Sequence, residues 1–246
     1  MSSGFFDAAI IDLDGTMVDT LGDFVVALNR MLADLSLSPV ERSVVGTRVG
    51  KGSEHLISAV LDHVLNRPVS LDGRSSVAIN KEAVGQLLPA AWSSYQRHYL
   101  AINGQHASVY PGVLEGLQLL QRQGLKLACL TNKPTAFALP LLKAKGLDGF
   151  FSLVFGGDSF ERKKPDPLPL RKTCEALGSA PSRTLMIGDS SNDAQAARAA
   201  GCPVLLVTYG YNHGQPVRGV DADGFVDTLA AMDLAALKTK TGLAPR

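Results

Sequence analysis

Two carboxylates stand where an apolar run meets a turn, and they are the first residues in the chain that suggest chemistry. Asp12 and Asp14 close a run that begins at Phe5, and a Gly15-Thr16 turn follows them. Alternate residues of a strand face the same side, so both carboxylates should point into one site. In an open α/β sheet, ligands bind at the carboxyl ends of the strands. An ordinary Asp-Gly turn is the structural alternative for this motif alone.

A second apolar run also ends in acidic residues. Asp189 follows Met186-Ile187-Gly188, and Asp193 stands at the start of a predicted helix. Mg²⁺ prefers a few carboxylate oxygens together with waters and substrate oxygens, and such ligands are available from Asp12, Asp189 and the backbone carbonyl of Asp14. Asp193 fits a position behind them, where it would orient Asp189 or a water. Capping of the helix through its dipole is an equal alternative for Asp193.

Two further motifs carry polar or basic side chains. Thr131 and Asn132 finish another apolar run, where they would donate hydrogen bonds to a phosphoryl oxygen. Alternatively, Asn132 or Lys133 simply begins a helix, with Pro134 in its first turn. Lys163 and Lys164 precede a proline just before a predicted helix, and lysines at such positions are mostly solvated surface charges.

The apolar pattern predicts the elements that would position these motifs. After residue 112, strand-like and helix-like runs alternate, which is typical of a parallel α/β sheet. The expected strands are 125–130, 152–155, 184–187 and 204–207, and the expected helices are 113–123, 136–145, 168–177, 193–200 and 228–237, followed by a frayed tail, 238–246.

The segment between the first strand and this region is predicted to be helical throughout. Helices are expected over 21–35, from Ser38-Pro39 onward, over 56–65 and over 83–102, with a polar connection at 68–76 and no strand between Val18 and Ser108. The sequence therefore predicts a doubly wound, Rossmann-like parallel sheet formed by residues 1–17 and 109–246. A helical cap domain, residues 18–108, is inserted into it.

Composition limits the classes of function. A formal net charge of +1 disfavours a nucleic-acid or membrane surface but allows a small local basic patch for an anionic substrate. The three cysteines, Cys129, Cys174 and Cys202, lack the spacing of a zinc site or a disulfide framework. No basic leader and no apolar run near ~18 residues is present, so a cytoplasmic protein with reduced thiols is expected.

The four motifs occur in the order found in the haloacid dehalogenase superfamily, a family made up mostly of magnesium-dependent phosphatases, and the chain resembles it. The resemblance implies that Asp12 is the nucleophile and Asp14 the general acid/base. It assigns phosphate contacts to Thr131 and Asn132. The lysine before proline, Lys164, matches the third motif, where its ammonium would hold the nucleophile and offset phosphoryl charge.

A closer resemblance is to the bacterial phosphoglycolate phosphatases, and five segments carry it: LTNKPTAFALPLL (130–142), FGGD (155–158), KKPDPLPL (163–170), GDSSND (188–193) and TYGYN (208–212). It implies hydrolysis of a small phosphorylated metabolite, 2-phosphoglycolate, through an aspartyl-phosphate, within carbohydrate metabolism. We expect the enzyme to be a monomer or homodimer. It is weakest in the helical insert, which is expected to select the substrate.

Lys51 allows other interpretations of the function. It lies between Gly50 and Gly52 in the insert, and its ammonium would either bind the substrate carboxylate or remain solvated on a glycine turn. It also lies in a region comparable to the Schiff-base lysine of phosphonoacetaldehyde hydrolase, a relative in the same superfamily. A receiver-like phospho-acceptor module and a dehalogenase are further alternatives. Both are disfavoured by Asp14, because neither needs a proton donor there.

Overall fold

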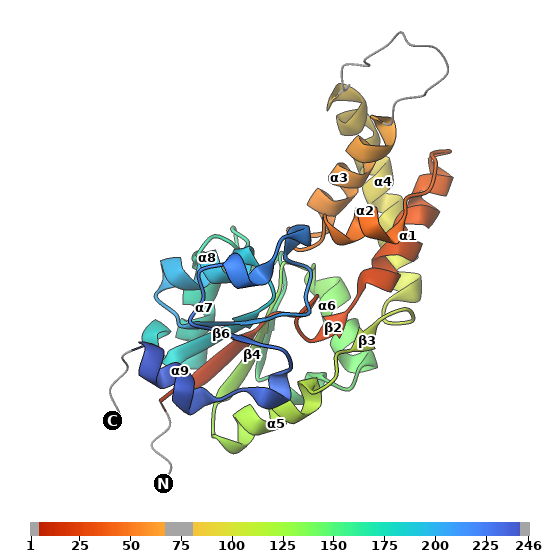
Figure 1. The fold of residues 1–246 in the computed structure, drawn as a ribbon. Helices are drawn as coiled ribbons and strands as arrows, with labels where there is room; N and C mark the ends of the chain where they lie inside the picture. The colour runs from red at the N-terminus through yellow and green to blue at the C-terminus, as the bar shows by residue number, and fades with distance from the viewer. Residues whose placement is uncertain (1–4, 67–80, 242–246) are drawn as a thin grey trace.

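A six-stranded parallel sheet forms the centre of the computed structural model, which describes residues 5–66 and 81–241 (Figure 1). The spatial order of the strands is β5-β4-β1-β6-β7-β8. In chain order they are β1 (Ala8–Ile11), β4 (Lys126–Leu130), β5 (Leu153–Phe155), β6 (Thr184–Gly188), β7 (Val204–Val207) and β8 (Gly224–Val226). The predicted α/β fold class is therefore confirmed.

Helices cover both faces of this sheet because its strands are apolar on both sides. In β1, Ala9 and Ile11 pack into a core cluster with α5 (Val113–Arg122) and α6 (Thr135–Ala144). Their neighbours Ala8 and Ile10 point the other way, as alternate strand residues must. They belong to a second cluster formed with α7 (Leu168–Leu177) and α8 (Ser191–Ala200).

The central position of β1 determines where the functional motifs meet. Its neighbours are β4 on one side and β6 on the other, and all three strands run parallel. The residues that follow them, Asp12, Thr131 and Asp189, consequently lie at the same edge of the sheet. The strand order also reverses here, which is the position where open α/β sheets bind ligands.

Four helices stand beyond this edge and have an apolar core of their own (Figure 1). They are α1 (Leu21–Asp34), α2 (Arg42–Gly46), α3 (Ser53–Leu65) and α4 (Lys81–Ile102). Their cluster is built around the stacked rings of Tyr95 and Tyr99, and Phe137 of α6 reaches into it from the sheet domain. This separate core supports the proposal that residues 18–108 form a cap.

Two short strands join the cap to the sheet domain, although no strand was expected between Val18 and Ser108. β2 (Val18–Asp19) pairs antiparallel with β3 (Ser108–Val109). That part of the prediction is wrong, because two-residue strands produce no recognisable alternation in the sequence. The pair brings the two crossings between the domains side by side.

Two other predicted elements differ from the structure, and one strand was not predicted. The second cap helix begins at Arg42 instead of Ser38-Pro39, because Asn29 hydrogen-bonds both the N–H and the carbonyl of Val40 and keeps this segment out of the helix. The last helix, α9, spans Leu234–Thr241 instead of 228–237, because Leu229–Ala231 form a separate 3-10 turn, and part of the expected frayed tail is therefore helical. β8 was missed because it has only three residues.

The predicted polar connection at 68–76 and the end of the tail, 242–246, lie outside the described residues. Within the part of the chain that is described, no helix has the length and apolar character needed to cross a membrane.

Candidate active site

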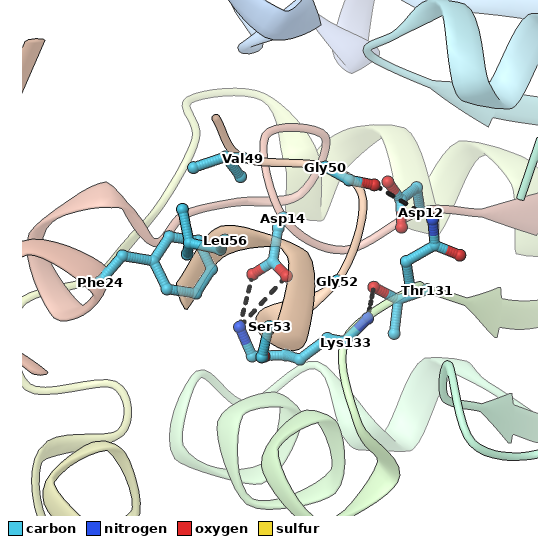
Figure 2. Close-up of a pocket in the computed structure, with 11 residues that line it drawn as sticks. Asp12, Asp14, Phe24, Val49, Gly50, Gly52, Ser53, Leu56, Thr131 and Lys133 are labelled. Carbon is cyan, nitrogen blue, oxygen red and sulfur yellow. Dashed lines mark hydrogen bonds and ion pairs between the residues drawn. The ribbon is translucent and has the colours of Figure 1, made fainter. Parts of the chain in front are cut away.

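A pocket lies at the edge of the sheet where the cap meets it (Figure 2). Both domains contribute to its lining, which comprises Asp12, Asp14, Thr131, Asn132 and Lys133 from the sheet domain and Phe24, Val49, Gly50, Gly52, Ser53 and Leu56 from the cap. The sequence motifs at the ends of β1 and β4 therefore meet in one cavity. Apolar cap side chains close its other side.

A buried lysine connects two carboxylates at one end of the site. Lys164 Nζ lies 3.0 Å from Asp12 Oδ1 and 2.7 Å from Asp193 Oδ1, and it donates a hydrogen bond to the carbonyl of Leu130 at 2.8 Å. The lysine side chain is 2% exposed. Lys164 is thus a fixed charge inside the site rather than a solvated surface lysine.

The burial and charges around Asp12 favour a reactive carboxylate at that residue. Burial raises the pKa of Asp12 to about 6, an effect that the nearby Lys164 ammonium partly opposes. Burial also disfavours the charge on Lys164, but Asp12 and Asp193 outweigh this and raise the pKa of the lysine above its usual value. At neutral pH the pair is therefore ionised, and Asp12 is more basic than a solvated aspartate.

Asp189 lies close to the backbone that carries Asp14. A Cβ atom on Gly15, which has φ of +83°, or on Gly210 would collide with the Asp189 side chain. Both positions therefore require glycine. Asp189 is 4% exposed, and its Oδ2 accepts a hydrogen bond of 2.7 Å from the Tyr211 N–H.

The donor set fits a divalent cation. Carboxylate oxygens of Asp12, Asp189 and Asp193 lie within 4.8 Å of one another. Burial first, and then the charges of Asp193 and Asp12, raise the pKa of Asp189 well above its usual value. The repulsion between these carboxylates destabilises the fold, and a bound cation would relieve it. Hard cations such as Mg²⁺ are bound through oxygens of this kind.

Within this cluster Asp193 is already occupied by protein contacts. Its Oδ1 accepts from Lys164, and its Oδ2 accepts from the backbone and hydroxyl of Ser190 in a capping box at the start of α8. It also accepts the Asp189 N–H at 3.2 Å. Asp193 therefore caps the helix and orients both Lys164 and Asp189, which leaves Asp12 and Asp189 as the better candidates for direct metal contact.

Replacing Asp189 with Asn is expected to raise the melting temperature of the metal-free protein at pH 7. The pKa of Asp189 is higher in the folded protein than its ordinary value of 3.8. Asp189 therefore does not lower the free energy of unfolding at pH values below 3.8, but it destabilises the fold increasingly as pH rises above 3.8. An amide removes the charge and keeps an acceptor for Tyr211. Thermal melts in chelator should show a gain of roughly 2 to 4 °C for each kcal/mol removed, which shrinks as pH falls.

The matched variant is Asp193→Asn, which should have the opposite effect. It leaves the buried Lys164 facing an amide instead of a carboxylate, and removal of one partner from a buried ion pair is destabilising. An Asp189→Asn protein that melts below wild type in chelator would contradict the account of charge crowding.

The phosphate contacts expected of Thr131 and Asn132 stay predictions, and the structure adds another role for Asn132. Thr131 lines the pocket. The amide of Asn132 donates to the carbonyls of Lys164 (2.8 Å) and Gly50 (3.0 Å), and its oxygen accepts the Lys164 N–H (3.0 Å). Both amide hydrogens are thereby used, so a phosphate contact at Asn132 would come from its backbone N–H. The alternative that Asn132 or Lys133 begins a helix is wrong, because α6 starts at Thr135 and its N-cap is Pro134.

The cap loop lies against the sheet domain, but Lys51 does not point into the pocket. Lys51 is exposed and is not part of the lining, whereas its neighbours Gly50 and Gly52 are. The carbonyl of Gly50 accepts hydrogen bonds from Asn132 at 3.0 Å and from Asn192 at 3.1 Å. Two amides of the sheet domain therefore hold the loop, and a substrate contact by Lys51 stays a prediction.

Sequence reasoning missed Lys133 as a member of the site. Its Nζ lies 2.8 and 3.1 Å from the two carboxylate oxygens of Asp14 (Figure 2). Asp14 also accepts a hydrogen bond from Thr20 Oγ1 at 2.8 Å. The sequence signal was its position at the end of a buried strand, directly after Thr131-Asn132.

Tyr211, within the TYGYN segment, is a second residue that was missed. Its N–H binds Asp189, and its hydroxyl donates to Asp19 Oδ1 at 2.8 Å while accepting from the N–H groups of Thr20 and Leu21. One residue thus links the acidic cluster to the crossing between sheet domain and cap.

Comparison with known proteins agrees with this geometry. The family model of haloacid dehalogenase-like hydrolases matches residues 6–201. The phosphoglycolate phosphatase of Thiobacillus denitrificans is 42% identical over 231 residues, covering 94% of this chain and 96% of the relative. A plasmid-encoded phosphoglycolate phosphatase of Cupriavidus necator is 42% identical over 238 residues, covering 97% and 95%.

Solved structures show the same architecture. The crystal structure of a predicted phosphoglycolate phosphatase from Haemophilus somnus superposes with a TM-score of 0.81 at 33% sequence identity, covering 92% of this chain and 96% of that one. The similarity therefore extends through the cap as well as the sheet domain.

Proposed function

The chain belongs to the haloacid dehalogenase-like hydrolases and is a phosphatase, and from this premise we propose that it is a magnesium-dependent phosphomonoesterase that hydrolyses 2-phosphoglycolate to glycolate and phosphate. The observation that carries the proposal is the pairing of Asp12 with Lys164 close to Asp189, together with the pocket that Asp12 and Asp14 both line. The substrate is suggested by the names of relatives that match over nearly the whole chain.

In the first step, the carboxylate of Asp12 attacks phosphorus and forms an aspartyl-phosphate. Lys164 fixes the orientation of Asp12 through Oδ1, and burial strengthens the carboxylate as a nucleophile. Asp14, held by Lys133 and Thr20, gives a proton to the departing alkoxide oxygen.

In the second step, Asp14 takes a proton from a water, which then attacks the acyl-phosphate and releases inorganic phosphate. Lys164 and the donors at Thr131 and Asn132 stabilise charge on the equatorial phosphoryl oxygens. The cap side chains Phe24, Val49 and Leu56 exclude bulk water from the leaving-group side. The aspartate is regenerated and the cycle is complete.

Mg²⁺, bound by Asp12, Asp189 and the Asp14 carbonyl, would supply positive charge that offsets repulsion between nucleophile and phosphate. Asp193 would hold Asp189 in place. We also propose a cytoplasmic enzyme, monomeric or homodimeric, that has no nucleic-acid or membrane partner.

Phosphonoacetaldehyde hydrolysis through a Schiff base on Lys51 is the second candidate function. Its support is the position of Lys51 in a loop whose glycines line the pocket. Lys51 itself is exposed, whereas a Schiff-base lysine needs a desolvated site. The geometry therefore favours the phosphatase.

A panel of small phosphate compounds tests the proposal. With Mg²⁺, kcat/KM for phosphate release should be highest for 2-phosphoglycolate and lower for ethyl phosphate and glycerol 3-phosphate. Chelator should abolish release, and added Mg²⁺ should restore it. Faster cleavage of phosphonoacetaldehyde, with borohydride trapping of an adduct at Lys51, would replace the phosphatase proposal with the Schiff-base hydrolase.

A further inference from the structure

Lys133 occupies an unusual position for a lysine. Its side chain is 1% exposed, and its ammonium is paired with the Asp14 carboxylate (Figure 2). The ammonium also lies over two aromatic rings of the cap. The Nζ atom is 4.5 Å from the centroid of Phe24 and 4.8 Å from that of Tyr99. A lysine is seldom buried this deeply unless its charge has a use in the folded protein.

The pocket around Lys133 has few other means of binding an anion. Among its described lining residues, Lys133 is the one that carries a positive charge, and Phe24, Val49 and Leu56 are apolar. Lys164 is already paired with Asp12 and Asp193, and Lys51 is exposed outside the lining. A second anionic group of a substrate would therefore meet Lys133 before any of these.

The short distance between the leaving oxygen and the carboxylate of 2-phosphoglycolate agrees with a carboxylate contact at Lys133. The inference rests on the proposed function, in which Asp14 stands beside the leaving oxygen. Lys133 Nζ is 2.8 Å from Asp14 Oδ1, so it lies next to the same oxygen. In 2-phosphoglycolate only one methylene separates that oxygen from the carboxylate carbon, which brings the carboxylate within reach of the ammonium.

We propose that Lys133 is the residue that recognises the carboxylate of the substrate, and that it selects 2-phosphoglycolate over phosphate esters of similar size that lack this group. The ammonium has three hydrogens, enough to bind Asp14 and the substrate carboxylate together. The aromatic rings hold it in place and exclude water, which strengthens its interaction with an anion. The cap thus contributes to selectivity through the rings that surround a lysine of the sheet domain.

The test compares two substrates on the same preparation of Lys133→Met. The ratio of kcat/KM for 2-phosphoglycolate to that for ethyl phosphate should fall by roughly 10- to 100-fold, as expected for loss of a charged hydrogen bond. This ratio does not depend on the fraction of folded enzyme, so partial unfolding cannot imitate the result. Lys133→Gln should behave alike, and Lys172→Met, which removes an exposed charge on α7, should leave the ratio unchanged.

A merely structural role would give a different pattern. If Lys133 only positions Asp14, kcat falls by the same factor for both esters and the ratio stays at the wild-type value, which overturns the proposal. A fall in the ratio for Lys51→Met but not for Lys133→Met also overturns it and assigns carboxylate recognition to Lys51.

A binding measurement separates this inference from the proposed function. The non-hydrolysable acid 3-phosphonopropionate should bind wild type more tightly than propylphosphonate, and Lys133→Met should remove the difference. Equal binding of both probes by wild type, without turnover of 2-phosphoglycolate, would refute the proposed substrate. A wild-type preference that persists in Lys133→Met would refute the role of Lys133 alone.

Discussion

Asp12→Asn is expected to lower kcat for phosphate release from 2-phosphoglycolate by at least ~10⁴-fold, because the amide keeps the shape of the side chain and removes the attacking oxygen. Asn can still occupy the space beside Lys164, so the sheet and its strand order should be retained. Steady-state assays with Mg²⁺ measure the loss. Circular dichroism and thermal melting check the fold.

A second readout makes this test specific to a nucleophile. Acid-quenched wild type, sampled during turnover, should carry one phosphoryl group on the peptide containing Asp12, and Asp12→Asn should carry none. Asp62→Asn, which changes an exposed carboxyl on α3, is the matched control and should behave as wild type. Retention of more than about 1% of wild-type kcat by pure Asp12→Asn would remove Asp12 from the nucleophile role.

The acidic ends of the core strands could be predicted from the sequence, because each strand and the residues after it form a recognisable local pattern. The run before Asp12 and the run before Asp189 are apolar, and the next residues are acidic. Because strands of a parallel sheet share one carboxyl edge, these acids had to approach one another, and their carboxylate oxygens do lie within 4.8 Å.

The contacts that orient the side chains of the site could not be predicted from the sequence. The pair Lys133–Asp14 joins residues 119 positions apart, and Tyr211 binds Thr20 across 191 positions. No local pattern specifies such contacts, because they depend on how the cap lies against the sheet domain. Lys51, in contrast, was conspicuous in the sequence between two glycines, yet the structure brings Gly50 and Gly52 to the pocket and leaves the lysine exposed.

Asp14→Asn should separate the two phosphoryl transfers by the chemistry of the leaving group. For alkyl esters such as 2-phosphoglycolate, loss of the proton donor should slow formation of the phosphoenzyme by about 10² to 10⁴-fold. For 4-nitrophenyl phosphate the leaving group needs no proton, so this step should remain fast. Hydrolysis of the phosphoenzyme needs a base and should be slow with either substrate.

Rapid mixing of Asp14→Asn with 4-nitrophenyl phosphate should therefore give a burst of nitrophenolate that matches the amount of enzyme, followed by slow turnover. Thr20→Val is the matched control, because it removes one hydrogen bond to Asp14 and keeps the carboxyl group, so its losses should be smaller for both esters. The assignment of Asp14 as the proton donor depends on the contrast between leaving groups. An equal slowing of phosphoenzyme formation from alkyl and nitrophenyl esters would show that Asp14 acts on phosphorus or on the metal site instead.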